Sequence, residues 1–120
     1  MSKRDYRLYI DDIIEAIKKI EEYSKGLSFD DFSEDSKAID AVVRNFEIIG
    51  EAVKHIPQRV RRKYPKVPWK LMAGMRDKLI HEYFGANKEV LWKTIKEDLP
   101  KVKPLIKEVL GEMEQEAETR

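Results

Sequence analysis

The chain has 120 residues, 42% of them hydrophobic and 39% charged, with a formal net charge of +1, which indicates one folded domain over residues 1–120 with a modest core. Because cysteine is absent, the sequence excludes disulfides, thiol catalysis and zinc sites built on cysteine. It also lacks an apolar run of membrane-spanning length and the apolar stretch of a signal peptide, so we expect a cytoplasmic protein without membrane contact.

The first half of the chain predicts two amphipathic helices joined by a polar connector. Apolar residues spaced three and four apart over Tyr6–Ile20 indicate a first helix, with Gly26 as its stop. The connector LSFDDFSEDS follows, and its Phe29 and Phe32 are available to pack onto the rest of the chain. A second helix is expected over about residues 35–56, with a buried face made of Ile39, Val42, Val43, Phe46, Ile49 and Val53.

The second half predicts a basic connector and three further helices. QRVRRKYPKVPW is expected to be mostly loop, with a short turn of helix before Tyr64. A third helix is expected over about residues 68–84 with Gly85 as its C-cap, and Asn87 is expected to cap a fourth helix. Two prolines crowd the start of a fifth, near residue 100. Since no segment shows the period-two alternation of strands, the sequence predicts an all-α, antiparallel up-and-down bundle of four to five helices.

Basic residues gather in the middle of the chain, although the total charge is near zero. From Ala52 to Arg76 there is no acidic residue, and the basic ones are Lys54, Arg59, Arg61, Arg62, Lys63, Lys66, Lys70 and Arg76. Such a run can bind a polyanion, and it is also common in a solvated connector between helices. Tyr64 and Trp69 offer rings for stacking on a base, although a tryptophan there is more typical of a core.

The stretch GMRDKLIHEYFG, residues 74–85, places a permanent charge among apolar positions. On an ideal helix of about 100° per residue, Arg76 falls within the apolar stripe and Tyr83 returns to within about 20° of it. His81 lies about 140° from Arg76, on the flank that carries Asp77.

Burying the guanidinium of Arg76 unpaired would be costly, because it cannot lose its proton. Two solutions are open. Either Arg76 pairs with a carboxylate of the second helix, Glu47 or Glu51, or the stripe lines a cleft where Arg76 meets an anionic ligand.

Arginine, histidine and tyrosine together suit phosphate chemistry. Cleavage of RNA by its own 2′-OH needs a base for that proton, a proton donor for the departing 5′-oxygen and positive charge beside the phosphorane. Taken singly, His81 can equally be a surface residue paired with Asp77, and Tyr83 a core aromatic. His55 is expected to be a structural residue near a helix end. Asp77 and His81 are only two potential ligands, so we expect no metal site and no cofactor.

Here the residues match a known family. MRDKLIHEYF resembles the R-x-x-x-x-H-x-Y signature of the HEPN superfamily, in the branch called HepT, with Arg76, His81 and Tyr83 matching position by position. IIGEAVKHIP and VPWKLMAGMRDKLIHEYFG resemble the second and third helices of that branch. The resemblance covers nearly the whole chain, and it implies a helical bundle that forms a homodimer with the motif facing a cleft near the two-fold axis.

The resemblance also implies an activity and partners. It implies a metal-independent endoribonuclease toxin of a type VII-like toxin–antitoxin system, with Arg76 and His81 of both subunits as the catalytic residues and Asp77 in support. A cognate minimal nucleotidyltransferase antitoxin would neutralise it by attaching AMP to Tyr83. RNA is then expected along the basic segment from Lys54 to Lys70. The alternative is a non-catalytic helical subunit that binds nucleotide or substrate for a nucleotidyltransferase complex.

Overall fold

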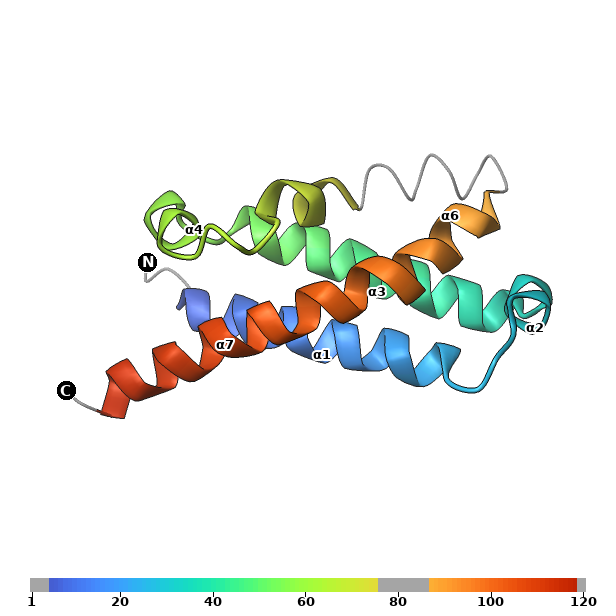
Figure 1. Cartoon of the computed structure of the whole chain (residues 1–120), viewed down its shortest axis with the longest axis horizontal. Coiled ribbons are helices and arrows are strands. Elements are labelled where there is room, and N and C mark those ends of the chain that lie inside the picture. Colours follow the sequence, from blue (N-terminus) through green and yellow to red (C-terminus); the bar gives the residue numbers. More distant parts are fainter. Residues whose placement is uncertain (1–4, 76–86, 119–120) are drawn as a thin grey trace.

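Helices make up the fold, as shown by a computed structural model that describes residues 5–75 and 87–118 (Figure 1). Within these ranges there is no strand, so the predicted all-α class is confirmed. The helical segments, in chain order, are α1 Tyr6–Ser24, α2 Phe29–Glu34, α3 Ser36–Lys54, α4 Gln58–Lys63, residues 69–75, α6 Lys88–Lys93, the π-helical turn η1 Thr94–Asp98, and α7 Leu99–Glu118.

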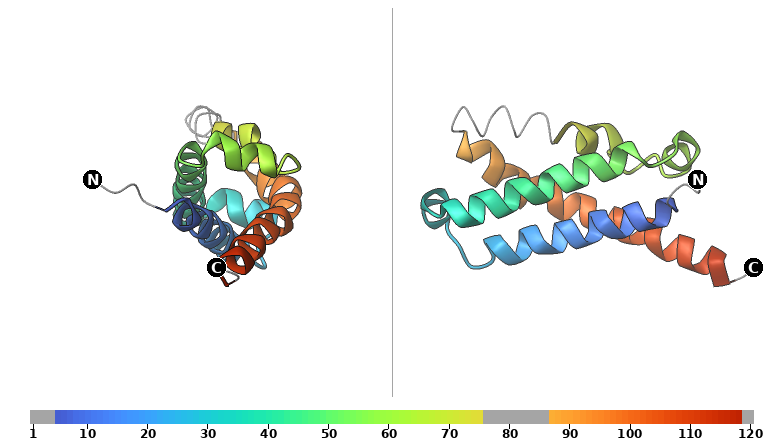
Figure 2. Two further views of the ribbon diagram at one scale, coloured as in Figure 1. Left: turned by 90° about the vertical axis from the view of Figure 1, so that its left-hand side faces the viewer. Right: turned by 180° about the vertical axis from the view of Figure 1, so that it is seen from behind.

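Three long helices form the body of the molecule. α1 and α3 lie side by side and run in opposite directions, and α7 crosses them on its way back toward the end where α1 begins (Figures 1 and 2). Seen end-on, these helices and the segment containing α4 surround a common interior (Figure 2). The molecule measures 50 × 27 × 26 Å. This is the up-and-down arrangement that the sequence predicts.

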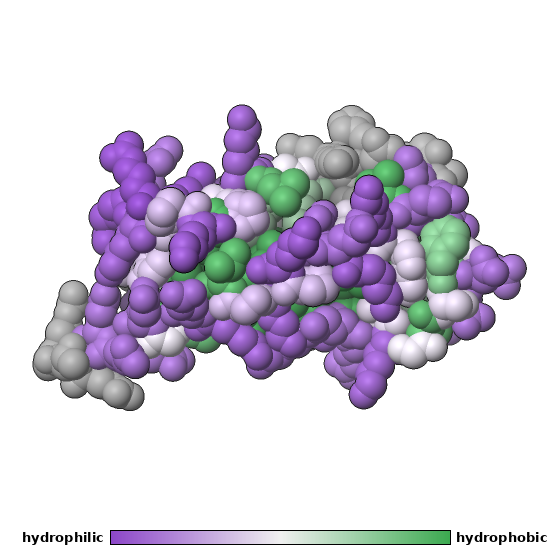
Figure 3. Space-filling view, viewed as in Figure 1, coloured by the Kyte–Doolittle hydropathy of each residue, from purple (hydrophilic) through white to green (hydrophobic). Residues whose placement is uncertain are grey.

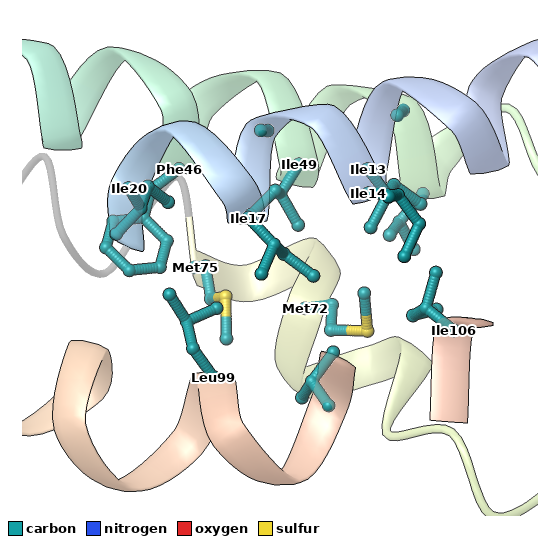
Figure 4. Close-up of a cluster of buried hydrophobic side chains, with 14 of the residues drawn as sticks. Ile13, Ile14, Ile17, Ile20, Phe46, Ile49, Met72, Met75, Leu99 and Ile106 are labelled. Carbon is teal, nitrogen blue, oxygen red and sulfur yellow. The ribbon is translucent and has the colours of Figure 1, made fainter. Parts of the chain in front are cut away.

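Isoleucine and other apolar side chains fill the interior because each long helix carries them three and four positions apart. The predicted buried face of α3 is buried in every position named above. Figure 4 shows how residues from four segments meet there: Ile13, Ile14, Ile17 and Ile20 of α1, Phe46 and Ile49 of α3, Met72 and Met75, and Leu99 and Ile106 of α7.

The helix ends follow local rules that the sequence already contains. Asp5 caps α1 by accepting a hydrogen bond from the Arg7 backbone N–H at 2.9 Å. Gly26 follows α1 with φ of +75°, the left-handed conformation that glycine adopts without strain. Asp35 caps α3 through the Ala38 N–H at 3.0 Å. The stop at Gly26 is therefore confirmed.

The connector between α1 and α3 is helical, and its prediction as a mere polar linker is wrong. Ser28 and Asp31 form a reciprocal capping box that starts α2. Phe32 is fully buried, with its ring 5.0 Å from that of Trp92, and Phe29 packs more loosely against the same indole. The expected packing of the two phenylalanines is confirmed. The cap and this burial together stabilise a helix that is too short to persist alone.

The expected break between a fourth and a fifth helix is also absent, because α6, η1 and α7 follow one another without a gap. Asn87 caps α6 as predicted, accepting from the Val90 N–H at 3.2 Å. Pro100 lies in the first turn of α7 and Pro104 inside it. Proline lacks an N–H and its ring crowds the carbonyl four residues earlier. The wider π-helical turn just before Pro100 gives that ring room, which lets the helix continue.

The face of the molecule seen in Figure 3 is mostly hydrophilic, and hydrophobic residues show between the hydrophilic ones. Among residues 5–75 and 87–118, the large apolar side chains that stay substantially exposed are Leu8, Tyr23 and Leu71. In the described part of the chain, no helix combines the length and the apolar character needed to cross a bilayer.

Candidate functional site

The signature residues Arg76, Asp77, His81 and Tyr83 fall in residues 76–86, outside the described residues, so their placement stays a prediction. The segment follows Met75, which is buried in the core, and precedes the cap of α6. The two carboxylates considered as partners for Arg76 have other neighbours in α3. Glu47 lies 3.6 Å from Arg44, and Glu51 lies 3.6 Å from the Nε2 of His55.

The basic segment from Lys54 to Lys70 is not one uniform surface, because Arg61 has a structural role. Its guanidinium donates hydrogen bonds to the backbone oxygens of Val53, at 2.7 Å, and Ile56, at 3.1 Å. Val53 lies in the last turn of α3 and Ile56 lies two residues past its end, where carbonyl groups lack the regular donors of the helix interior. Arg61 therefore caps α3 and neutralises the negative end of its dipole.

Tyr64, Trp69 and Lys63 connect the same segment to the rest of the fold. The Lys63 ammonium pairs with Glu116 of α7 at 2.5 Å. Burial, and then the hydrogen bond to Glu112, raise the pKa of the Tyr64 hydroxyl above its usual value. Trp69 is only 6% exposed, and its indole N–H donates to the Tyr64 carbonyl at 3.0 Å. The interpretation of Trp69 as a core residue is confirmed, so its ring is not free to stack on a base, whereas Tyr64 is half-buried with the Lys63 ammonium 5.6 Å from its ring centroid.

A subset of the basic residues remains available to a polyanion. These side chains are exposed and, within residues 5–75 and 87–118, form no ion pair; they are Lys54, Arg59, Arg62, Lys66 and Lys70. Exposed lysine and arginine side chains bind phosphates with little desolvation cost. The predicted RNA-binding segment therefore reduces to these five cations.

A hollow of about 1020 Å³ opens where α1 begins and α3 ends. The two helices are antiparallel, so the first turn of α1 lies beside the last turn of α3, and the following residues up to α4 close one side. We call it the α1–α3 groove; it is lined by Asp5, Tyr6, Tyr9, Lys54, His55, Ile56, Pro57 and Arg59.

Aromatic rings and cations face each other in this groove. The rings of Tyr9 and His55 stack with centroids 4.7 Å apart and planes inclined by 11°. The guanidinium of Arg59 lies 5.3 Å from the ring centroid of Tyr6, a cation–π contact. The carboxylate of Asp5 is bound to Arg7 at 2.8 Å, and this guanidinium lowers the pKa of Asp5. The groove thus offers positive charge together with stacked aromatic surface.

No pattern described above predicts this groove. His55 is the C-cap of α3, near a helix end as expected, but it also lines the groove and stacks on Tyr9. From the sequence, Tyr6 and Tyr9 belong only to the apolar stripe of the first helix. The sequence feature that could have indicated the groove is a pair of tyrosines, Tyr6 and Tyr9, at the start of one helix, together with Lys54 and His55 at the end of its antiparallel partner. In the described part of the chain, no three His, Asp or Glu side chains converge in a way that could hold a metal ion.

The sequence of this chain is similar to proteins named as ribonucleases. The family described as Ribonuclease HepT-like matches residues 13–109. A protein named probable ribonuclease HepT from Thermococcus cleftensis is 54% identical over 101 residues, which cover 84% of this chain and 92% of that one. A candidate RNase of Methanocaldococcus jannaschii is 44% identical over 118 residues, covering 95% and 98% of the two chains. A candidate RNase of Caldanaerobacter subterraneus is 49% identical over 104 residues, covering 87% and 93%. No solved structure matches the chain.

Proposed function

This chain belongs to the HepT-like ribonuclease family, and from that premise we propose that it is an endoribonuclease that cleaves RNA without a metal ion. The observation that carries the proposal is the extent of the family match, residues 13–109, which includes Arg76, His81 and Tyr83. The relatives named as ribonucleases support the same activity. The exposed cations between Lys54 and Lys70 supply a surface for the RNA backbone.

The proposed chemistry uses Arg76 and His81 from both subunits of a homodimer. One imidazole takes the proton from a 2′-OH, and this oxygen attacks the neighbouring phosphorus. The bond to the 5′-oxygen breaks, and that oxygen takes a proton from the second imidazole. The products are a 2′,3′-cyclic phosphate and a free 5′-hydroxyl. Arg76 stabilises the charge of the phosphorane, and Asp77 orients His81.

The test is cleavage of a labelled RNA by the purified protein in EDTA. Arg76→Ala and His81→Ala should each lower the cleavage rate at least about 100-fold, because each removes charge stabilisation or proton transfer. Circular dichroism should show unchanged helix content. Arg44→Ala is the matched control, since the Arg44 side chain is 71% exposed and belongs to α3, outside the signature stretch of the sequence.

Two outcomes would contradict this assignment. Wild-type rates in both variants would show that the signature residues do not cleave RNA. If the wild-type protein binds AMP or ATP tightly in a calorimetric titration and cleaves no RNA, the non-catalytic nucleotide-binding subunit becomes the better description. Sedimentation should give a dimer, twice the 14.2 kDa of the chain.

The second part of the proposal concerns control of a toxin by its antitoxin. A cognate minimal nucleotidyltransferase would transfer AMP from ATP to Tyr83: the phenol oxygen attacks the α-phosphorus, pyrophosphate leaves, and a phosphodiester forms. The added phosphate would then lie on the same predicted helix stripe as Arg76 and block the RNA.

Tyr83→Phe should abolish both the labelling from α-labelled ATP and the neutralisation of cleavage by the transferase. Tyr23→Phe is the matched control, because Tyr23 is also a helix tyrosine and is 46% exposed. Normal labelling of the Tyr83→Phe variant would contradict the assignment of the modified residue.

A further inference from the structure

The stack of Tyr9 on His55 has one side open to the α1–α3 groove. Tyr9 is half-buried on α1, whereas the His55 side chain is 50% exposed and lines the hollow. Since the tyrosine ring covers one face of the imidazole, at 4.7 Å and 11°, the other face is available to a further planar ring. Stacking of this kind is how proteins hold the bases of single-stranded nucleic acids.

The charges around the stack suit phosphate groups on either side of such a base. Lys54 precedes His55 on α3, and Arg59 approaches from α4 while its guanidinium lies 5.3 Å from the Tyr6 ring. Among the described residues, neither cation forms an ion pair. The groove's own aspartate, Asp5, is bound to Arg7 at 2.8 Å.

The end of α3 would ordinarily repel an anion, because the last carbonyls of a helix carry partial negative charge. Here Arg61 donates to the Val53 and Ile56 oxygens and covers that charge. Glu51 remains as the nearby carboxylate, 3.6 Å from the Nε2 edge of His55. That contact is at the ring edge, so it orients the imidazole and leaves its face uncovered.

We propose that the α1–α3 groove binds one unpaired nucleotide of the RNA, with its base stacked on His55 and its flanking phosphates on Lys54 and Arg59. The ligand is RNA because the proposal rests on the ribonuclease function stated above. A paired base has both faces covered by its neighbours in the helix, so the groove selects single-stranded RNA over duplex. The hollow of about 1020 Å³ is as large as the biggest ordinary small-ligand sites, so its volume is sufficient for a nucleotide.

The test measures binding of a fluorescent single-stranded 2′-O-methyl oligonucleotide, which lacks the 2′-OH needed for cleavage. His55→Ala should raise its Kd about 5- to 150-fold, the range that corresponds to loss of one base stack. His55→Phe keeps a ring at the same position and should bind within about threefold of wild type. Both changes are at an exposed position, so helix content should stay unchanged.

The phosphate contact is tested by salt dependence. Arg59→Gln should weaken binding and reduce the slope of log Kd against log salt by about 0.7, because one phosphate contact to a single strand is lost. Lys96→Gln is the matched control: Lys96 makes the same kind of contact, 4.6 Å from the ring of Trp92, but on η1 and outside the groove. Tyr23→Ala is the matched aromatic control.

Several outcomes would overturn the proposal. It fails if His55→Ala binds like wild type, or if His55→Phe loses as much affinity as His55→Ala. It also fails if duplex RNA competes as well as single-stranded RNA, or if AMP does so at the same concentration. The two proposals separate cleanly. If His55→Ala cleaves RNA and binds the oligonucleotide like wild type, the ribonuclease proposal stands and the groove proposal is wrong. If His55→Ala weakens binding but the wild-type protein cleaves no RNA, the groove proposal stands and the ribonuclease proposal is wrong.

Discussion

At the scale of single residues, neighbouring cations of one short helix have different roles. Arg59 and Arg61 are two positions apart on α4, which places them about 200° apart around the helix axis. Arg61 therefore turns to the end of α3 and bonds its carbonyls, while Arg59 turns to Tyr6 and the groove. Two identical residue types in one basic run thus divide into a structural cap and a candidate ligand contact.

We expect Arg61→Ala to lower the free energy of unfolding by about 2 kcal/mol, because it removes two hydrogen bonds from a charged donor to partly buried carbonyls. Arg62→Ala, an exposed neighbour, should change it by less than about 0.5 kcal/mol. Urea denaturation monitored by circular dichroism measures both. Equal effects of the two changes would show that the cap contributes nothing to stability.

Tyr64 gives a pH dependence with a definite sign. Burial, and then the hydrogen bond to Glu112, raise the pKa of its hydroxyl in the folded protein above the ordinary value near 10.0. The stabilisation from Tyr64 is therefore complete below the pKa of the unfolded chain and is lost as the pH rises through the folded pKa.

Ultraviolet titration should show an ionisation step above the ordinary tyrosine value near 10.0, and Tyr64→Phe should remove that step. The difference in stability between wild type and Tyr64→Phe should shrink above about pH 10. If it grew with pH instead, the inferred burial of the hydroxyl would be wrong.

At the scale of elements, short helices depend on what they pack against. α2 has six residues, too few to be stable alone, and it is held by its capping box and by the Phe32–Trp92 contact with α6. Lys88 adds a link by donating to the Ser33 carbonyl at 2.7 Å. The ammonium of Lys103 similarly joins α7 to Glu21 of α1 at 2.7 Å.

Phe32→Ala should lower the free energy of unfolding by about 3–5 kcal/mol, because it leaves a cavity beside Trp92 in a fully buried position. Phe29→Ala is the matched control and should cost clearly less, since Phe29 is only half-buried and lies 6.2 Å from the same ring. Thermal and urea denaturation measure both variants. A smaller loss for Phe32 than for Phe29 would contradict the packing order.

At the scale of the whole molecule, charge is separated although the net charge is only +1. Five exposed cations lie on α4 and on the residues that flank it: Lys54, Arg59, Arg62, Lys66 and Lys70. The sequence has no acidic residue from Ala52 to Arg76. Acidic residues from α7 reach this region as partners of the structural residues Lys63 and Tyr64. The five exposed cations therefore keep a net positive surface.

Binding of single-stranded RNA should depend steeply on salt. If all five exposed cations contact phosphates, log K should fall against log salt with a slope of about −3.5, at about −0.7 per contact. A double variant, Lys66→Gln with Lys70→Gln, should reduce the slope by about 1.4. Fluorescence anisotropy from 50 to 300 mM salt measures it. A slope near zero would rule out this surface as the RNA track.

The sequence alone determined the helical class, the long helices and their buried faces. The apolar spacing of α1 and α3, the caps at Asn87 and Gly26, and the signature residues Arg76 and His81 are all contained in contiguous stretches. Helical periodicity and capping are local effects, so a local pattern is enough to predict them.

The tertiary structure decided which polar residues are structural and which are available. Arg61 bonds the end of α3 because α3 ends beside α4, and Tyr9 meets His55 only because α1 and α3 are antiparallel. The continuous helix from α6 to α7 likewise depends on the π-helical turn η1, which no residue pattern predicts. Contacts between segments distant in the chain depend on how the helices pack, so composition and spacing do not specify them.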